Sequence, residues 1–249
     1  MKQFLFLIAI LFATLKLSAQ NVQLQQANEA YAKGDFQTAS GLYEELLKAN
    51  GESATVYYNL GNSYYKLNKV APSILNYERA LLLEPGNNDI RFNLEIAKLK
   101  TVDKIEPIGD FFLSEWFLAV QNLWSTDAWC NFSILCFILL IVCLFFFFFS
   151  RHIFIKKLGF YVAVGLLIAV VLGNSFAYNQ KKKLTQRNEA IIFASTTTIK
   201  SSPDTSGTDL FILHEGTKVK VKNKVGNWNE IVTADGNVGW INNSEMEVI

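Results

Sequence analysis

Two long uncharged runs of apolar residues in the middle of the chain limit its fold more than any other feature. The first is Phe132–Phe149, and the second is Leu158–Tyr178. As helices they would measure about 27 Å and about 32 Å, close to the thickness of the hydrocarbon core of a bilayer. Core helices of soluble proteins usually carry a polar face, so a pair of buried core helices is the weaker alternative. The two runs therefore predict two transmembrane spans.

The segment between these runs decides how the spans are arranged. It covers Ser150–Lys157 and carries the basic residues Arg151, Lys156 and Lys157. A connection this short cannot hold a domain, so we expect an antiparallel hairpin over residues 131–180. The parts of the chain before and after the hairpin then lie on the same side of the membrane.

The composition of the chain excludes several classes of function. The formal net charge of +1 at pH 7 argues against binding of nucleic acid. The cysteines Cys130, Cys136 and Cys143 all lie in or beside the first run, so neither soluble part can contain a disulfide framework. The sequence has no cysteine–histidine pair, phosphate-binding loop or metal-ligand spacing. We therefore expect no enzymatic activity, no cofactor and no metal site.

The N-terminal residues 1–19 have the pattern of a secretory signal peptide. Lys2 supplies the positive charge, Phe4–Leu15 the apolar stretch, and Leu17–Ala19 a plausible cleavage context. Lys16 is unusually close to that cleavage context, so an uncleaved membrane anchor is the alternative. Both interpretations predict export of the region that follows.

A helical repeat follows the signal. Tyr43 recurs as Tyr77, 34 residues later. The second copy carries a characteristic set of residues, namely Tyr57, Leu60, Gly61, Tyr64, Tyr77, Ala80 and Pro85. This pattern resembles the tetratricopeptide repeat, in which each unit is a pair of antiparallel helices. The repeat region, residues 20–100, then divides into units at 20–53 and 54–87 and a capping helix at 88–100.

This resemblance implies a groove lined by the first helix of each unit. Asn28 and Asn62 occupy equivalent positions one repeat apart, and so do Asn59 and Asn93. Asparagine amides can hydrogen-bond both polar groups of an extended peptide backbone, which suits peptide capture. The alternative is that these residues solvate the surface or tie neighbouring helices together. The predicted groove residues are Asn28, Tyr58, Asn59, Asn62, Tyr65, Lys66 and Asn93.

The stretch between the repeats and the first span, residues 101–130, is rich in aromatic side chains and poor in charge. Tryptophan favours the bilayer interface because it combines an apolar body with one polar atom. We therefore expect Gly109–Trp124 to form an amphipathic helix on the membrane surface. A docking helix for a partner subunit is the alternative.

Residues 188–249 have the pattern of short strands separated by turns. Val219–Val221 alternates in polarity, and Asp235–Gly236 is a typical hairpin turn. The spacing of apolar residues and glycines over the segment resembles the bacterial SH3-like barrel. Barrels of that family bind cell-wall peptides or protein partners, which makes Trp228 and Trp240 candidate surface residues. The alternative is that these tryptophans fill the core of the barrel.

The order of these parts is more specific than any one of them. A signal, a short repeat array, an aromatic segment, a membrane hairpin and a barrel together resemble the BatE-type family of the Bacteroides aerotolerance operon. The stretches Thr101–Pro107, Arg187–Ile191 and Ser201–Gly216 add to that resemblance. It implies a non-enzymatic scaffold that works beside membrane proteins with von Willebrand factor A domains and a MoxR-type ATPase.

The sequence thus predicts a multidomain protein with all-α tetratricopeptide helices, a two-helix transmembrane hairpin and a small all-β SH3-like barrel. The first functional hypothesis is an adaptor for protein partners, anchored in the inner (cytoplasmic) membrane with both soluble domains extracytoplasmic. The basic loop between the spans fits the positive-inside rule for this topology. The basic residues Lys181–Lys183 and Arg187 do not, because they follow the second span on the side taken to be outside. The alternative is a cell-wall anchor whose barrel binds peptidoglycan peptides.

Overall fold

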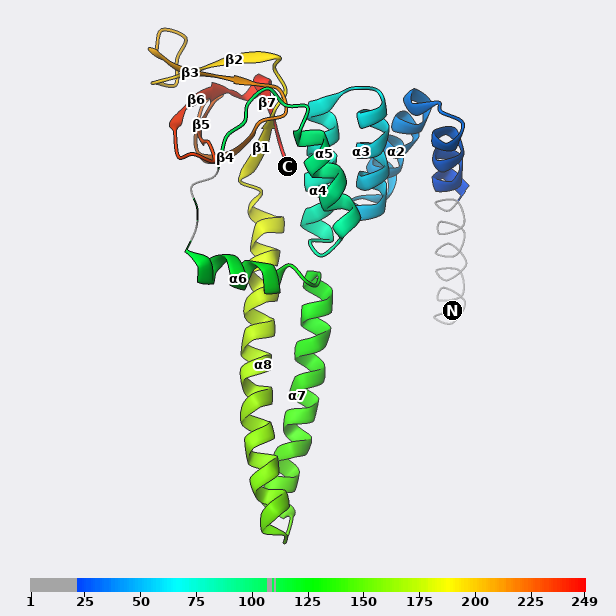
Figure 1. The fold of residues 1–249 in the computed structure, drawn as a ribbon, viewed down its shortest axis with the longest axis vertical. Helices are drawn as coiled ribbons and strands as arrows, with labels where there is room; N and C mark the ends of the chain where they lie inside the picture. The colour runs from blue at the N-terminus through cyan, green and yellow to red at the C-terminus, as the bar shows by residue number, and fades with distance from the viewer. Residues whose placement is uncertain (1–21, 107–108, 110) are drawn as a thin grey trace, which may run out of the picture. The chain divides into compact units, whose positions relative to one another are not determined.

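The computed structural model describes residues 22–106, 109 and 111–249, and the chain divides into two compact units. One unit combines the N-terminal helices with the C-terminal sheet, and the other contains the long apolar helices that separate these two parts in the sequence (Figure 1). The predicted signal peptide at residues 1–19 lies outside the described residues. The described chain contains the predicted kinds of structure: paired helices, two long apolar helices and an antiparallel sheet.

The helices of the first unit follow one another as antiparallel pairs. A helix over residues 22–32 is followed by α2 (Phe36–Asn50), α3 (Ala54–Lys66), α4 (Val70–Leu83) and α5 (Asn88–Lys98). The side chains of Asp35, Ser53 and Asn87 cap α2, α3 and α5 by accepting hydrogen bonds from backbone N–H groups of the first turn. Each of these helices therefore begins at a polar residue that satisfies part of its own N-terminus.

The turn inside each helix pair requires a backbone conformation that most residues avoid. Gly34 has φ 82°, and Asn68, the equivalent residue one repeat later, has φ 58°. Glycine and asparagine adopt this left-handed region more readily than other residues. The second repeat can therefore keep the same turn although its glycine has been replaced.

Small residues bring the paired helices close together. A Cβ atom on Gly61 of α3 would lie 2.7 Å from the ring of Tyr77 on α4, so a larger residue would push the two helices apart. The Ser73 hydroxyl donates a hydrogen bond of 2.9 Å to the Gly61 carbonyl oxygen in the same buried contact. The close packing of the second helix pair therefore depends on glycine at position 61.

The C-terminal part of the first unit is an antiparallel sheet. Its strands are β1 (Glu189–Ile192), β2 (Thr196–Lys200), β3 (Asp209–His214), β4 (Lys218–Val225), β5 (Trp228–Val232), β6 (Val238–Asn242) and β7 (Met246–Val248). They pair in the order β3-β2-β6-β5-β4-β1-β7. Aliphatic side chains fill the core, including Ile192, Ile199, Val219, Ile231 and Ile241. Ile105, from the segment that follows α5, packs against this core and so belongs to the barrel structurally.

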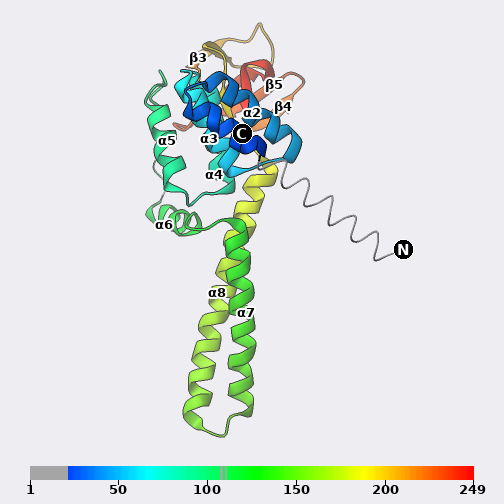
Figure 2. The same ribbon diagram turned by 90° about the vertical axis from the view of Figure 1, so that its right-hand side faces the viewer.

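The second unit contains α6 (Phe112–Gln121), α7 (Thr126–Phe149) and α8 (Ile153–Gln186). Both views show α7 and α8 lying side by side and antiparallel (Figures 1 and 2). Only 17% of the most apolar window of α7 and 6% of that of α8 is buried, so their apolar side chains mostly face outward. A core helix of a soluble protein would bury these side chains, so the length and exposure of the two helices suggest insertion in a membrane.

Glycines also set the distance between the two long helices. A Cβ atom on Gly173 of α8 would lie 2.4 Å from the Ser133 hydroxyl oxygen of α7, whereas one on Gly165 would meet nothing within 4 Å. Gly173 therefore faces the neighbouring helix and Gly165 faces outward. Only one of these two glycines contributes to contact between the helices.

The start of the hairpin is held by a group of polar and aromatic side chains within the second unit. Gln180 of α8 donates hydrogen bonds of 2.8 Å and 2.9 Å to the carbonyl oxygens of Gln121 and Trp124. The indole N–H of Trp129 donates to the same Gln121 carbonyl at 2.9 Å. These bonds satisfy carbonyl groups at the end of α6, whose residues Phe112, Leu113 and Trp116 remain exposed. Exposed side chains of this kind are typical of a helix at a bilayer interface.

Candidate functional site: repeat groove, barrel face and junction

The predicted groove asparagines form two copies of one hydrogen-bonded triad. In the first copy the Asn28 side-chain oxygen accepts hydrogen bonds from the Tyr43 hydroxyl at 2.7 Å and from the Asn59 amide at 3.3 Å. One repeat later, the oxygen of Asn62 accepts from Tyr77 at 2.6 Å and from Asn93 at 2.9 Å. Each triad therefore connects the two helices of one repeat with the first helix of the next.

These triads place polar groups beside the buried cores of the repeats. Burial raises the pKa of Tyr43 to about 12, and the pKa of Tyr77 is raised in the same direction for the same reason. Both phenols therefore act as hydrogen-bond donors at physiological pH. The asparagines accept those bonds, so they tie helices together irrespective of any ligand that they bind. This agrees with the structural alternative that the sequence left open.

The other predicted groove residues lie on the same side of α3. Tyr58, Tyr65 and Lys66 share a face with Asn62 by helical spacing. The Tyr58 hydroxyl accepts a hydrogen bond of 2.9 Å from Asn93, while the Lys100 ammonium lies 4.0 Å from the centre of the Tyr65 ring. Lys66 is exposed. Tyr58 lies outside both triads but is hydrogen-bonded to Asn93. Tyr65 and Lys66 are therefore the predicted groove residues that can meet a partner without disturbing a triad.

The two candidate tryptophans of the barrel lie on one face of the sheet. In the pairing of β5 with β6, Glu230 is opposite Trp240 and Trp228 is opposite Asn242. Alternate residues of a strand point to the same side, so Trp228 and Trp240 are diagonal neighbours on that face. Both are half-buried, and the cluster of buried residues in the barrel core is made of other side chains. The tryptophans therefore form part of the outer surface rather than the centre of the barrel.

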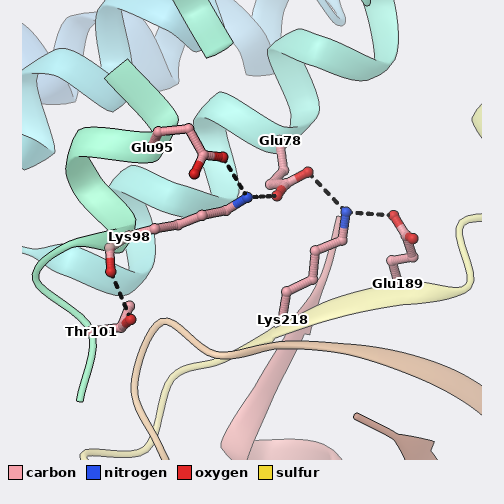
Figure 3. Close-up of polar contacts among 6 residues, drawn as sticks. All are labelled: Glu78, Glu95, Lys98, Thr101, Glu189 and Lys218. Carbon is pink, nitrogen blue, oxygen red and sulfur yellow. Dashed lines mark hydrogen bonds and ion pairs between the residues drawn. The ribbon is translucent and has the colours of Figure 1, made fainter. Parts of the chain in front are cut away.

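A polar junction between the repeats and the barrel is the feature that sequence reasoning missed. Glu78 of α4 accepts a hydrogen bond of 2.9 Å from Lys218 of β4 and lies 3.5 Å from the ammonium of Lys98 on α5. Lys218 also pairs with Glu189 of β1 at 2.8 Å, and Lys98 pairs with Glu95 at 3.1 Å (Figure 3). The side chain of Glu78 is only 10% exposed, so the centre of the network lies out of water, whereas the outer carboxylates of Glu95 and Glu189 are 64% and 43% exposed.

Glu78 and Lys218 each stabilise the charged form of the other. Burial opposes ionisation of Glu78, but the ammonium groups of Lys218 and Lys98 outweigh that effect and lower the pKa of the carboxyl. Burial likewise opposes charge on Lys218, but Glu78 and Glu189 outweigh it and raise the pKa of Lys218 to about 12. Glu78 and Lys218 are therefore both charged over the physiological pH range.

A second contact of the junction is centred on Asp103, which follows α5. Its carboxylate accepts hydrogen bonds of 2.7 Å from the backbone N–H of His214 and from the Thr217 hydroxyl. Its other oxygen lies 2.7 Å from Nδ1 of His214. Burial alone would raise the pKa of Asp103, but the bonds from Thr217 and His214 lower it. The segment after α5 is thereby fastened to the turn between β3 and β4.

Arginine makes a third contact between the same two parts. Arg79 of α4 donates hydrogen bonds to Glu247 at 3.0 Å and to the Val248 carbonyl oxygen at 2.7 Å. The three family-like stretches singled out by the sequence contain Asp103, Glu189 and His214, all members of the junction. The sequences of those stretches do not tell which residue pairs with which.

Within the described residues, no group of three or more His, Cys, Asp or Glu side chains is placed to hold a metal ion. Two parts of the chain match known families. Residues 54–87 match the tetratricopeptide repeat, and residues 195–247 match the bacterial SH3 domain. The first range coincides with the predicted second repeat unit, and the second falls inside the predicted barrel.

A comparison with curated proteins gave no match to the sequence. The family matches and the fold together show a tetratricopeptide repeat and a bacterial SH3 domain in one compact unit. The other unit contains two helices that are long and apolar enough to cross a membrane.

Proposed function

We propose that this protein is a non-enzymatic, membrane-anchored adaptor that binds protein partners through the repeat groove and the barrel. The observation that carries this proposal is the packing of a tetratricopeptide repeat and a bacterial SH3 domain into one compact unit. Both kinds of module suggest binding to proteins or to the cell wall. Two weak sites held at a fixed spacing bind one partner more tightly than either alone, through effective concentration.

The order of parts supports a more specific proposal. Repeats, an aromatic entry segment, a membrane hairpin and a barrel follow one another as in BatE of the Bacteroides aerotolerance operon. On that resemblance the partners are membrane proteins with von Willebrand factor A domains, acting with a MoxR-type ATPase. Asp103, Glu189 and His214 lie in the stretches that carry this resemblance, and their contacts hold the two modules together, which supports the proposal.

Contacts across the hairpin support a topology with two spans. Asp103 precedes both long helices and His214 follows them, yet the two side chains lie 2.7 Å apart. Residues in contact must lie on the same side of a membrane, so the chain between them crosses an even number of times. With an N-terminal signal for export, both soluble modules are extracytoplasmic and the loop at Arg151–Lys157 is cytoplasmic.

Co-purification of the full-length protein from mild detergent tests the adaptor proposal. We expect membrane proteins to be recovered with the wild type and lost with the double variant Tyr65→Ala, Lys66→Glu, because these residues belong to neither triad. Lys33→Glu, a charge change at an exposed turn residue, is the matched control. Equal recovery of the same partners with the double variant and the wild type would exclude the groove as their binding site.

A second candidate function is anchoring to the cell wall, and the paired tryptophans on the barrel face favour it. Aromatic platforms beside polar groups suit amphipathic ligands such as wall peptides. The full-length protein in detergent should then sediment with purified sacculi, and Trp228→Ala with Trp240→Ala should abolish sedimentation. A protein that stays in the supernatant at every ratio of sacculi argues for the adaptor instead.

A further inference from the structure

A cleft lies at the junction inside the first unit. Its volume is about 600 Å³, within the range of about 300–1,000 Å³ that is typical of ligand sites. The lining comes from α5, from the segment that follows it, and from β1, β4 and the end of β5. Ile105 and Val232 supply an apolar surface within it. The cleft exists only because the repeats and the barrel are joined, so neither module contains it alone.

The lysines of the cleft differ in what they contact. The ammonium groups of Lys98 and Lys218 pair with the carboxylates of the junction. Lys104 donates instead to two backbone carbonyl oxygens at the end of α5, at 3.0 Å and 3.1 Å. Lys220 is exposed, and no carboxylate among the described residues pairs with it or with Lys104. Within the described part of the chain, these two ammonium groups of the cleft therefore have no anionic partner.

Strand geometry places one of these lysines beside the apolar surface. In the sheet, Lys220 of β4 stands opposite Glu189 of β1 and opposite Val232 of β5. Residues directly opposite one another in an antiparallel sheet project from the same side, so the side chain of Lys220 lies next to that of Val232. A ligand whose carboxylate reaches Lys220 therefore meets an apolar side chain beside it.

The remaining charges of the cleft select against densely charged ligands. Glu95, Asp103 and Glu189 also line it, so a nucleic acid or a cluster of phosphates would meet carboxylates at close range. We propose that the cleft binds an extended acidic segment of a partner protein, with single carboxylates at Lys104 and Lys220 and apolar side chains against Ile105 and Val232. This site goes beyond the groove and the tryptophan face, and it requires both modules in one unit.

Fluorescence anisotropy of a labelled peptide measures this binding directly. The protein is full-length and held in detergent micelles, and the peptide alternates aspartate with valine and has blocked ends. We expect saturable binding in the micromolar range that weakens as salt is raised. Lys220→Gln should weaken it about fivefold, because a charge-assisted hydrogen bond is lost, and Lys104→Gln with Lys220→Gln should weaken it further. Lys33→Gln changes an exposed turn residue that does not line the cleft, so it should leave the affinity for the peptide unchanged.

The design separates loss of binding from loss of folding. Lys220 is exposed and holds no ion pair among the described residues, so its variant should unfold at the wild-type temperature. Three results would each overturn the proposal. One is that the wild type shows no binding up to about 1 mM peptide. The others are that the double lysine variant binds the peptide as tightly as the wild type, or that the wild type binds a peptide with asparagine for aspartate as tightly as the acidic one. Binding of purified wall peptides in place of the acidic peptide would also overturn it. The groove variant Tyr65→Ala, Lys66→Glu should bind the peptide as the wild type does, because the groove and the cleft are separate sites. If the cleft does not bind the acidic peptide, the adaptor proposal, which is tested through the groove, is unaffected.

Discussion

The Glu78 carboxylate accepts a hydrogen bond of 2.9 Å from the ammonium of Lys218, although 140 positions separate the two residues in the sequence. Glu78 belongs to the second helix pair and Lys218 to the barrel. Because the Glu78 side chain is only 10% exposed, it depends on protein cations rather than on water for stabilisation. The stability of each module is therefore coupled to the presence of the other.

Lys218→Met tests this coupling. It leaves Glu78 with Lys98 as its remaining cation, so we expect the unit to lose roughly 2 kcal/mol of unfolding free energy, less than for a fully isolated buried charge. Thermal unfolding of the full-length protein in detergent, followed by circular dichroism, measures the loss. Lys220→Met on the same strand is the matched control and should change stability by less than about 0.5 kcal/mol. Equal melting temperatures for the two variants would contradict the coupling.

Acid should weaken the junction. The pKa values of Glu78 and Asp103 are lower in the folded protein than their ordinary values of 4.5 and 3.8. Groups with lowered pKa bind more protons in the unfolded chain, so their stabilisation is complete above those ordinary values and is lost as the pH falls through the folded ones. The melting temperature should therefore fall steeply below about pH 4.

Asp103→Asn should reduce this dependence, because the asparagine has no charge to lose. The variant should be less stable than the wild type at pH 7, and the difference should shrink as the pH falls toward 3. Glu45→Gln changes an exposed carboxyl on α2 and serves as the control. If the melting temperatures of Asp103→Asn and the wild type differed by the same amount at every pH, the charge of Asp103 would have no part in the loss of stability in acid.

The triads predict the cost of losing one asparagine. Asn62→Ala leaves the hydroxyl of Tyr77 without its acceptor in a largely buried position, which should cost about 1–3 kcal/mol. Adding Tyr77→Phe removes that hydroxyl, so the double variant should lose less than the sum of the two single variants. Chemical unfolding followed by helix content checks this. Simple additivity would mean that the bond contributes nothing to stability.

Gly165 and Gly173, two of the three glycines of α8, should differ in their tolerance of larger residues. Gly173→Leu places its side chain against Ser133 of α7 and should weaken the hairpin by about 1–3 kcal/mol. Gly165→Leu points into open space and should be neutral. Resistance of the helix pair to unfolding in increasing amounts of dodecyl sulfate compares them. The opposite order of sensitivity would place the contact between the helices on the other face of α8.

Cysteine labelling tests the proposed topology. Single cysteines are placed at Lys33, Lys157 and Thr205, which are exposed, in a background with Cys130, Cys136 and Cys143 replaced. We expect a membrane-impermeant maleimide to label positions 33 and 205 in spheroplasts, and position 157 only after the membrane is opened. Labelling at 157 with protection at 205 would invert the second half of the chain.

Local patterns were enough to predict the parts of this protein. The repeat, the apolar runs and the strand turns each leave a signal within a few tens of residues. Asn28 and Asn62 could be matched across the repeat, but their bonds to Tyr43 and Tyr77 depend on side-chain directions that periodicity does not give. The outward position of Trp228 depended on which face of β5 was buried, and either register was compatible with its sequence.

The junction could not be derived from the sequence in the same way. Lys218 stands in a strand with other lysines, and nothing nearby in the chain indicates that it pairs with Glu78. Glu78 itself is an acidic residue among buried neighbours of α4, which was the only local hint. Ion pairs between distant segments depend on how finished modules dock, so they appear only in the three-dimensional structure.

The position of Ile105 has a consequence for how this protein is made. That residue packs against the barrel core but is synthesised before the hairpin, whereas every strand of the described sheet is synthesised after it. In a protein anchored as proposed, the barrel can complete its core only once both long helices have been threaded through the bilayer. A finished barrel would thus mark a chain that has been correctly inserted, and a chain stalled during insertion would expose apolar strands to the cell's proteases.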